Sequence, residues 1–244
     1  MWKTNREVTT VRIINTRAAH QLGPVRKAVE SRGGTSIDLP VIRIAGKRPD
    51  FLPGPADWLV FTSVNSVAQW RRIRPWQGEK VACVGKKTAD AAQAAGYPVT
   101  LLPPGTEADA EGLAAVLCRE ASGSRILYPR SARARPVLVR ELAACGCEVE
   151  APVVYDTVTD PSAAGRLERE VQNADAILLY SPSAVQACME LLPDGLPPHL
   201  LAGCIGRVTE EAFTSWSTNE YCVPEEPDTE TLIELLFEKR SSAT

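Results

Sequence analysis

The sequence predicts an α/β protein with two doubly wound, mainly parallel-sheet domains and an internal duplication. Short apolar runs alternate with segments of helical periodicity along the chain, and the same order of elements occurs twice. The apolar runs are nearly continuous, which is typical of parallel strands covered by helices on both faces of a sheet. At 244 residues, the chain is long enough for two such domains.

The elements of the first half follow from local patterns. An apolar run, Val11–Thr16, is the first strand, and the helix after it ends at Gly33-Gly34, which suit a left-handed C-terminal cap. A second strand, Ile37–Ile44, leads into a loop with three prolines, GKRPDFLPGPAD. Further strands are expected at Leu59–Thr62, Val81–Val84 and Val99–Leu102, with helices at Ser63–Trp70, Lys87–Ala95 and Glu107–Arg119.

The second half repeats this plan. Strands are expected at Arg125–Tyr128, Glu148–Val158, Ile177–Tyr180, Leu201–Ile205 and Tyr221–Val223. Helices are expected at Pro136–Ala144, Ser183–Leu192, Thr209–Trp216 and Thr229–Lys239. Both halves therefore have two strands around a helix, a break, and then three strands with their helices.

The clearest repeat is DWLVFTSVNSV at Asp57–Val67, which recurs as DAILLYSPSAV at Asp175–Val185. Each stretch predicts a buried strand, a turn rich in hydroxyl or amide groups, and a helix N-terminus. Such a turn exposes backbone N–H groups beside the positive end of a helix dipole, which suits an anion. The duplication alone is compatible with domains at 1–120 and 121–244.

Composition narrows the chemistry. The formal net charge of −3 provides no strongly basic field, so we expect no nucleic-acid partner. Two histidines, no G-x-G-x-x-G and no complete phosphate loop argue against a metal or a nucleotide cofactor. The seven scattered cysteines are expected to be reduced core thiols. MWKTNREVTT lacks the apolar core of a signal peptide and no apolar run is long enough for a membrane span, so we expect a cytoplasmic protein.

Seven ordered motifs together resemble the uroporphyrinogen-III synthase family over nearly the whole chain. They are Asn15-Thr16-Arg17, FTSVNSV, VGKKTA at Val84–Ala89, LYPRS with L-x3-L-x3-G at Leu138–Gly146, PVVYDT at Pro152–Thr157, LLYSPSAV at Leu178–Val185 and IGRVTEEA at Ile205–Ala212. The chain departs from the family pattern at Ala18, where Pro is usual, and at Glu210, where Ala is usual.

The resemblance implies two flavodoxin-like domains joined by a two-stranded linker, with the substrate in the cleft between them. One domain would comprise residues 1–40 and 160–244, the other residues 45–154, and the linkers residues 41–44 and 155–159. The implied reaction is the cofactor-free cyclisation of hydroxymethylbilane to uroporphyrinogen III, with loss of water and inversion of the last pyrrole ring. The substrate has eight carboxylates, which suits repeated helix N-termini. A monomer is expected, with transient contact with the preceding pathway enzyme.

Tyr155 is the candidate catalytic residue, because it closes the PVVYDT strand and a neutral phenol can donate a proton to the departing hydroxyl. The alternative is an aromatic side chain packed under the linker. Expected substrate-binding residues follow strands or begin helices: Arg17, Thr62, Ser63, Asn65, Gly85, Lys86, Thr88, Arg130, Ser181, Ser183, Gly206 and Thr209. Plain helix capping is the alternative for Ser63, Asn65, Ser181 and Ser183. A tight strand-to-helix turn is the alternative for Gly85 and Gly206, and a solvated surface position is the alternative for Arg17 and Arg130. Arg133, Arg135 and the Trp70–Arg74 segment are expected to form solvated surface.

Two other classes of function remain open. One is a non-catalytic module that binds or senses an anionic ligand on the same two-domain fold, because a fold does not determine a function. The other is a transferase with an anionic donor, against which the missing phosphate loop and metal ligands count.

Overall fold

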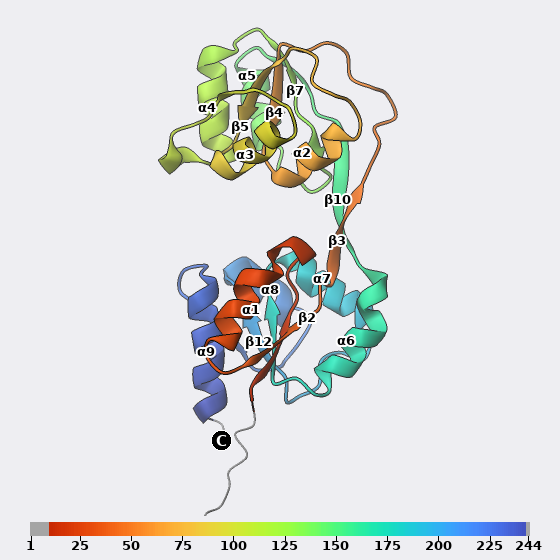
Figure 1. Cartoon of the computed structure of the whole chain (residues 1–244), viewed down its shortest axis with the longest axis vertical. Helices are drawn as coiled ribbons and strands as arrows, with labels where there is room; N and C mark the ends of the chain where they lie inside the picture. The colour runs from red at the N-terminus through yellow and green to blue at the C-terminus, as the bar shows by residue number, and fades with distance from the viewer. Residues whose placement is uncertain (1–9, 243–244) are drawn as a thin grey trace, which may run out of the picture. The chain divides into compact units, whose positions relative to one another are not determined.

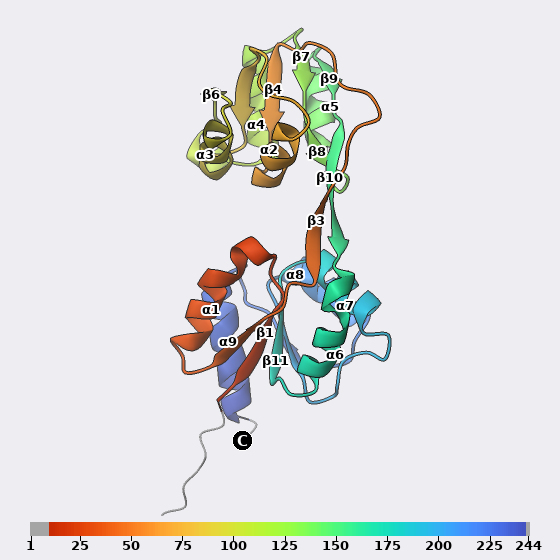
Figure 2. The ribbon, with the colours of Figure 1, turned by 45° about the vertical axis from the view of Figure 1, so that its right-hand side comes forward.

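The chain folds into two compact units and passes from one to the other twice. A computed structural model describes residues 10–242. Unit 1 contains the chain up to Arg43 and from Val158 onward, and unit 2 contains Ile44–Thr157. Each unit is built on its own five-stranded sheet (Figures 1 and 2).

The sheet of unit 1 takes strands from both ends of the chain. Its order is β13 (Tyr221–Cys222), β12 (Leu201–Cys204), β11 (Ala176–Leu179), β1 (Arg12–Asn15) and β2 (Thr35–Asp38), and all neighbours pair in parallel. Helices α1 (Leu22–Glu30) and α9 (Thr229–Ser242) lie side by side on one face (Figures 1 and 2). On the other face lie α6 (Ala164–Val171), α7 (Pro182–Leu191) and α8 (Arg207–Thr214). Both faces are thus buried, which explains the near-continuously apolar strands.

The sheet of unit 2 has the order β6 (Val99–Leu101), β5 (Lys80–Cys83), β4 (Trp58–Phe61), β7 (Arg125–Leu127) and β9 (Glu148–Glu150), again with parallel pairing. Helices α2 (Val64–Arg71) and α3 (Lys86–Ala94) cover one face. The other face is covered by α4 (Ala110–Glu120) and α5 (Val137–Ala144). The expected α/β class with parallel sheets is confirmed.

The duplication is visible in how the halves pair. Asp175, which opens the second repeat, accepts a hydrogen bond from the backbone N–H of Arg12 at 2.8 Å. Asp57, its counterpart in the first repeat, accepts the same bond from Arg125 at 2.8 Å. The first two strands of each half therefore join a sheet with the last three strands of the other half. This exchange rules out sheets built from residues 1–120 and 121–244 separately.

Two expected strands are each divided in two. The run Ile37–Ile44 becomes β2 and β3 (Ile42–Gly46), and Glu148–Val158 becomes β9 and β10 (Val153–Thr159). Prolines, Pro40 and Pro152, lie at the two breaks, and a proline has no N–H for a strand ladder. Strands β3 and β10 form a separate three-stranded sheet with β8 (Arg130–Ser131), and they carry the two crossings between units. Arg130 therefore lies in β8 rather than at the end of β7.

Helix α6 was missing from the sequence prediction. It follows Asp160, whose side chain accepts a hydrogen bond from Ser162 N at 3.1 Å in the single 3-10 turn Pro161–Ala163. Leu167 and Val171 are buried on its inner face. Asp-Pro-Ser followed by apolar residues four apart is a helix start that the sequence contained.

The prediction that the Trp70–Arg74 segment forms solvated surface is partly wrong. Trp70 is fully buried and Arg74 is 7% exposed. Arg74 forms an ion pair with Glu79, stacks 5.4 Å from the Trp70 ring, and receives a hydrogen bond on its carbonyl from the Tyr97 hydroxyl at 2.9 Å. Burial lowers the pKa of Arg74. The local sequence showed only a basic helix end. The groups that pair with Arg74 in the interior, Glu79 and Tyr97, lie further along the chain.

Two cysteines are not the reduced thiols that the sequence predicted. Cys118 in α4 and Cys145 at the end of α5 form a disulfide with a Cα–Cα distance of 5.5 Å. The prediction was wrong because it relied on sequence spacing, whereas the packing of α4 against α5 brings these two residues together. The remaining five cysteines are free and buried.

Reduction of this disulfide is expected to lower the free energy of unfolding by about 3–4 kcal/mol, because the closed loop restricts the unfolded chain. Thermal unfolding with and without dithiothreitol measures the effect. A Cys118→Ser/Cys145→Ser variant serves as the control, since its midpoint should not respond to the reductant. A wild-type midpoint that the reductant leaves unchanged would contradict the prediction.

Ala18 has a backbone conformation that a proline, the usual residue of the family at this position, could adopt. Its φ is −55°, within the range of a proline ring. We expect Ala18→Pro to raise the free energy of unfolding by about 0.4–1 kcal/mol, because proline restricts the unfolded chain. Urea unfolding of the two proteins tests this, and a less stable variant would show that the neighbouring backbone does not accept the ring.

Candidate active site

A cluster of hydroxyl groups lies at the carboxyl end of β4 in unit 2. Thr62 and Ser63 follow the strand, and Ser63 is the N-cap of α2. Tyr155 in β10 places its phenol oxygen 2.8 Å from Ser63 Oγ. Tyr128, just after β7, places its phenol oxygen 3.1 Å from Thr62 Oγ1. Two consecutive turn residues thus hold two phenols that come from distant parts of the chain.

Tyr155 is only 7% exposed and belongs to the core cluster that also contains Phe61 of β4 and Trp70 of α2. The burial agrees with the alternative of a packed aromatic, and the catalytic role of Tyr155 stays a prediction. The ring is a packed strand aromatic, while the hydroxyl reaches the turn where a ligand of a parallel sheet is expected. The ring position is fixed by the packing, which suits a group that must meet a reacting atom.

Tyr128 was not among the expected site residues. It is 3% exposed, and burial raises the pKa of its phenol, an effect that the hydrogen bond with Thr62 opposes. At neutral pH it is therefore a neutral donor or acceptor. The available signal was a tyrosine directly after an apolar strand, in the LYPRS motif.

The corresponding turn of unit 1 carries different groups. Ser181 is the N-cap of α7 and accepts a hydrogen bond from Ala184 N at 3.2 Å. Arg17 stacks 4.0 Å from the centre of the Tyr180 ring and donates Nη2 to Thr229 Oγ1 at 3.1 Å. Burial raises the pKa of Tyr180 to about 12. Arg17 is consequently held in place by unit 1 itself rather than extended into solvent.

The other expected cations have local partners. Arg130 directs Nε to the Ala151 carbonyl and Nη1 to the Ser131 carbonyl, each at 3.3 Å. Lys86 is highly exposed and pairs with Asp90 one turn along its own helix at 3.1 Å. Neither residue contacts the hydroxyl cluster through a hydrogen bond found among residues 10–242.

Equivalent glycines begin α3 and α8. Gly85 and Gly206 have extended backbones, with φ of −175° and 179°, so their conformations do not require glycine. A Cβ at Gly85 would lie 3.4 Å from Ala108, and one at Gly206 would lie 3.4 Å from Pro227. In each half, a residue that precedes the next helix therefore lies close to the glycine, Ala108 at Gly85 and Pro227 at Gly206.

The remaining expected residues lie in the first turns of helices. Asn65 and Ser183 are half-buried at the starts of α2 and α7. Thr88 and Thr209 are buried more deeply, with 5% and 3% exposed. The carboxylate of Glu210 raises the pKa of the Tyr221 phenol, so Glu210 interacts with β13.

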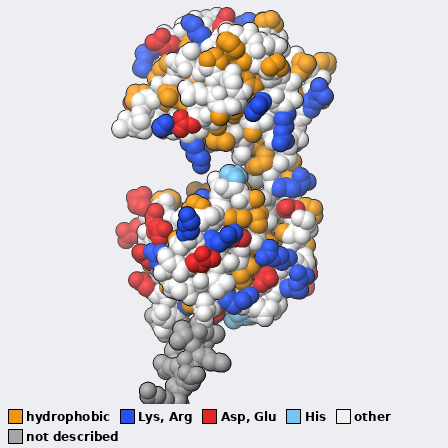
Figure 3. All heavy atoms as spheres, viewed as in Figure 1, with side chains coloured by type: hydrophobic (Ala, Val, Ile, Leu, Met, Phe, Trp, Pro, Cys, Tyr) orange, Lys and Arg blue, Asp and Glu red, His pale blue; other side chains and the backbone are white. Residues whose placement is uncertain are grey.

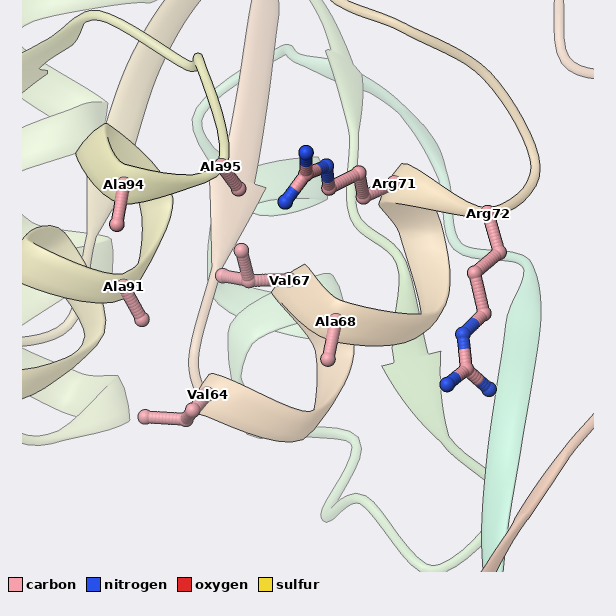
Figure 4. A pocket seen from close by; sticks show the side chains of 8 residues that line it. All are labelled: Val64, Val67, Ala68, Arg71, Arg72, Ala91, Ala94 and Ala95. Carbon is pink, nitrogen blue, oxygen red and sulfur yellow. The ribbon is translucent and has the colours of Figure 1, made fainter.

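A cavity of about 600 Å³ lies elsewhere in unit 2, between α2 and α3. Figure 4 shows that Val64 and Val67 of α2 face Ala91, Ala94 and Ala95 across it, while Arg72 points away. Its lining carries none of the expected site residues, so it is separate from the hydroxyl cluster.

Charge is arranged locally. On the face drawn in Figure 3, Lys and Arg side chains are dispersed over both units and do not form one basic field. Among residues 10–242, no three His, Cys, Asp or Glu side chains are grouped as a metal site would require. In the same residues, no helix has the length and hydropathy needed to cross a membrane.

Comparison with known proteins identifies the family. The family model described as "Uroporphyrinogen-III synthase HemD" matches residues 24–234. The chain belongs to the uroporphyrinogen-III synthase family. The expected resemblance is therefore confirmed, and the match includes both strand-end turns.

Individual relatives agree with this membership. A protein of Synechococcus elongatus described as uroporphyrinogen-III synthase is 32% identical over 133 residues, which are 48% of this chain and 49% of the relative. The matched region thus spans about half the length of that curated relative.

Two solved structures share the fold. Uroporphyrinogen-III synthetase from Helicobacter pylori has a TM-score of 0.63 at 16% identity and covers 95% of this chain and 100% of its own. A mutant uroporphyrinogen III synthase from Thermus thermophilus has a TM-score of 0.53 at 19% identity and covers 96% and 100%.

Proposed function

We propose that this protein is a uroporphyrinogen-III synthase, a cyclising hydro-lyase that converts hydroxymethylbilane to uroporphyrinogen III in tetrapyrrole biosynthesis. The observation that carries the proposal is the family match over residues 24–234. The hydroxyl cluster around Tyr155 supplies a proton donor at the end of a parallel sheet, where ligands of this fold class bind. Family membership favours this enzyme over the ligand-binding module and the transferase.

Tyr155 would donate its phenol proton to the hydroxyl that leaves as water. Loss of that group leaves an electrophilic carbon, which bonds to the substituted α-carbon of the last pyrrole ring and forms a spiro intermediate. The bond between that ring carbon and its original methylene bridge then breaks, which leaves this methylene electrophilic. The free α-carbon of the same ring bonds to the methylene, so the ring is inverted. The ring carbon that makes the closing bond loses its proton as aromaticity returns, and that proton restores the phenol. One water is lost overall, and no cofactor is needed in this scheme.

Carboxylate binding would be shared by the strand-end groups of each unit. In unit 2, we propose the N–H groups at the starts of α2 and α3, with Thr62, Asn65, Gly85 and Thr88. In unit 1, we propose Arg17 and the starts of α7 and α8, with Ser181, Ser183, Gly206 and Thr209. Each charge-assisted hydrogen bond contributes about 1.5–3 kcal/mol. Lys86 is paired with Asp90, and Arg130 donates to backbone carbonyls. We therefore propose that these two cations contribute least to carboxylate binding.

The proposed substrate closes by itself to the wrong isomer, so catalysis mainly requires geometry. We also propose a monomer that acts in the cytoplasm and receives its substrate by transient contact with the preceding enzyme. The cytoplasm is reducing, so we propose that the Cys118–Cys145 disulfide of the structure is opened there to two thiols. Sedimentation at working concentration tests the monomer, and a dimer would refute it.

The test of the activity uses the purified chain and hydroxymethylbilane. The product is oxidised, and isomers I and III are separated by chromatography. We expect isomer III to form faster than isomer I forms in a protein-free control. Isomer I alone, at the rate of the control, would refute the proposed function.

A further inference from the structure

Ser63 has more hydrogen-bond contacts than a helix cap needs. Its Oγ accepts from Ser66 N at 3.0 Å, which is the capping bond. The same oxygen lies 2.8 Å from the Tyr155 hydroxyl and 3.3 Å from Ser66 Oγ. One side chain therefore connects the start of α2 to the candidate proton donor.

Counting protons leaves Ser63 able to donate to either Tyr155 or Ser66, because the Ser63–Tyr155 bond can run in either direction. A hydroxyl has one proton to donate and two lone pairs. Ser66 directs its hydroxyl proton to the Ser63 carbonyl at 2.7 Å, so Ser66 Oγ is left as an acceptor. Ser63 Oγ already accepts from Ser66 N, and its own proton has two possible acceptors, of which Tyr155 is nearer by 2.8 Å against 3.3 Å.

If Ser63 donates to Tyr155, the phenol proton is not used within the cluster. Among the described residues, the Tyr155 hydroxyl has no hydrogen-bond partner besides Ser63. The phenol proton is then available to a ligand. Tyr128 does not compete for Ser63, because its hydroxyl is paired with Thr62 at 3.1 Å.

We propose that Ser63 is a positioning residue that donates its hydroxyl proton to the Tyr155 oxygen and leaves the phenol proton directed at the substrate. This inference rests on the proposed function and on the proposed role of Tyr155. The bond orients the phenol, and it stabilises negative charge on that oxygen while the proton is transferred. Ser63 would thus act through Tyr155 rather than by gripping a carboxylate, which is the role expected from the sequence.

A double-mutant cycle tests the proposal with Ser63→Ala, Tyr155→Phe and the combination. We expect Ser63→Ala to lower kcat for isomer III about tenfold with KM changed less than twofold. In the Tyr155→Phe background, the same change should lower kcat less than twofold, because the group it acts through is gone. Ser63→Thr retains the hydroxyl and should recover most of the lost kcat.

Two variants separate positioning from capping. Asp109 caps α4 in the same unit, accepting from Gly112 N at 2.7 Å, and lies outside the cluster, so Asp109→Ala should destabilise the protein with kcat unchanged. Ser63→Asp keeps a good cap but removes the donor, so it should fold normally with kcat as low as Ser63→Ala. It also protects the test if Ser63→Ala unfolds.

Several results would overturn the inference alone. They are an effect of Ser63→Ala confined to KM, additive effects in the cycle, full kcat in Ser63→Asp, or unchanged kcat in Tyr155→Phe. Each can occur in a protein that makes isomer III, so each leaves the proposed function standing. A wild-type protein that makes no isomer III would refute the proposed function and this inference with it.

Discussion

Replacing Tyr155 with Phe is expected to lower kcat for isomer III about 100-fold while KM changes little. The substitution removes one oxygen, which the structure places 2.8 Å from Ser63 Oγ. The ring is held by β4 and α2 and should remain in place. General acid catalysis by a positioned side chain contributes about 100–10,000-fold, and the low end applies because the substrate reacts without a catalyst. Initial rates of isomer III formation measure the effect.

Tyr97→Phe is a matched control for this variant. Tyr97 is also a buried tyrosine of unit 2 with one hydrogen bond, from its hydroxyl to the Arg74 carbonyl at 2.9 Å. Its loss should cost about 1 kcal/mol of stability and leave kcat unaffected. If Tyr155→Phe kept wild-type turnover, or if both variants lost turnover equally, the proposed role of Tyr155 would be wrong.

Replacing Glu79 with Gln is expected to lower the free energy of unfolding by about 3–5 kcal/mol. The Arg74 and Glu79 side chains are 7% and 2% exposed, and they form an ion pair with each other. The second carboxylate oxygen of Glu79 accepts from Gln77 N at 3.0 Å. The substitution leaves a buried guanidinium without its counter-charge, which is costly because few water molecules can replace the lost partner.

Urea unfolding measures this loss, and two comparisons interpret it. Glu141→Gln breaks the exposed pair of Arg140 and Glu141, whose side chains are 69% and 47% exposed, and should cost less than about 1 kcal/mol. Arg74→Met/Glu79→Leu removes both charges and should recover most of the stability. If Glu79→Gln were as mild as Glu141→Gln, the buried pair would not stabilise unit 2.

Local sequence was enough to predict the type and position of most elements. The strand and helix start at Asp57–Val67 recur as β4, Ser63 and α2, because apolar runs form buried strands and a serine caps the next helix. The helix ends at Gly33 and Gly146 were also readable, since both glycines have positive φ, near 80°. Of the candidate site, capping by Ser63 and Ser181 was predictable from their positions, whereas their role in binding carboxylates stays a prediction.

Partners that are far apart in sequence could not be predicted in this way. Asp57 accepts from the backbone N–H of Arg125, and Asp175 accepts from that of Arg12. No local pattern shows this, because the repeat is equally compatible with Asp57 paired to Arg12 and Asp175 paired to Arg125. The Cys118–Cys145 disulfide and the burial of Arg74 were missed for the same reason. Each depends on which helices and loops pack together.

By itself, the sequence determined that the chain forms parallel α/β sheets in duplicate, with hydroxyl-rich turns at the strand ends and a tyrosine in the PVVYDT strand. Only the tertiary structure decided that Tyr155 of β10 meets Ser63 of β4–α2, at a sequence separation of 92 residues. The reason is physical: propensity and capping act over a few neighbouring residues, whereas a side-chain hydrogen bond between strands requires the sheet order and register to exist first.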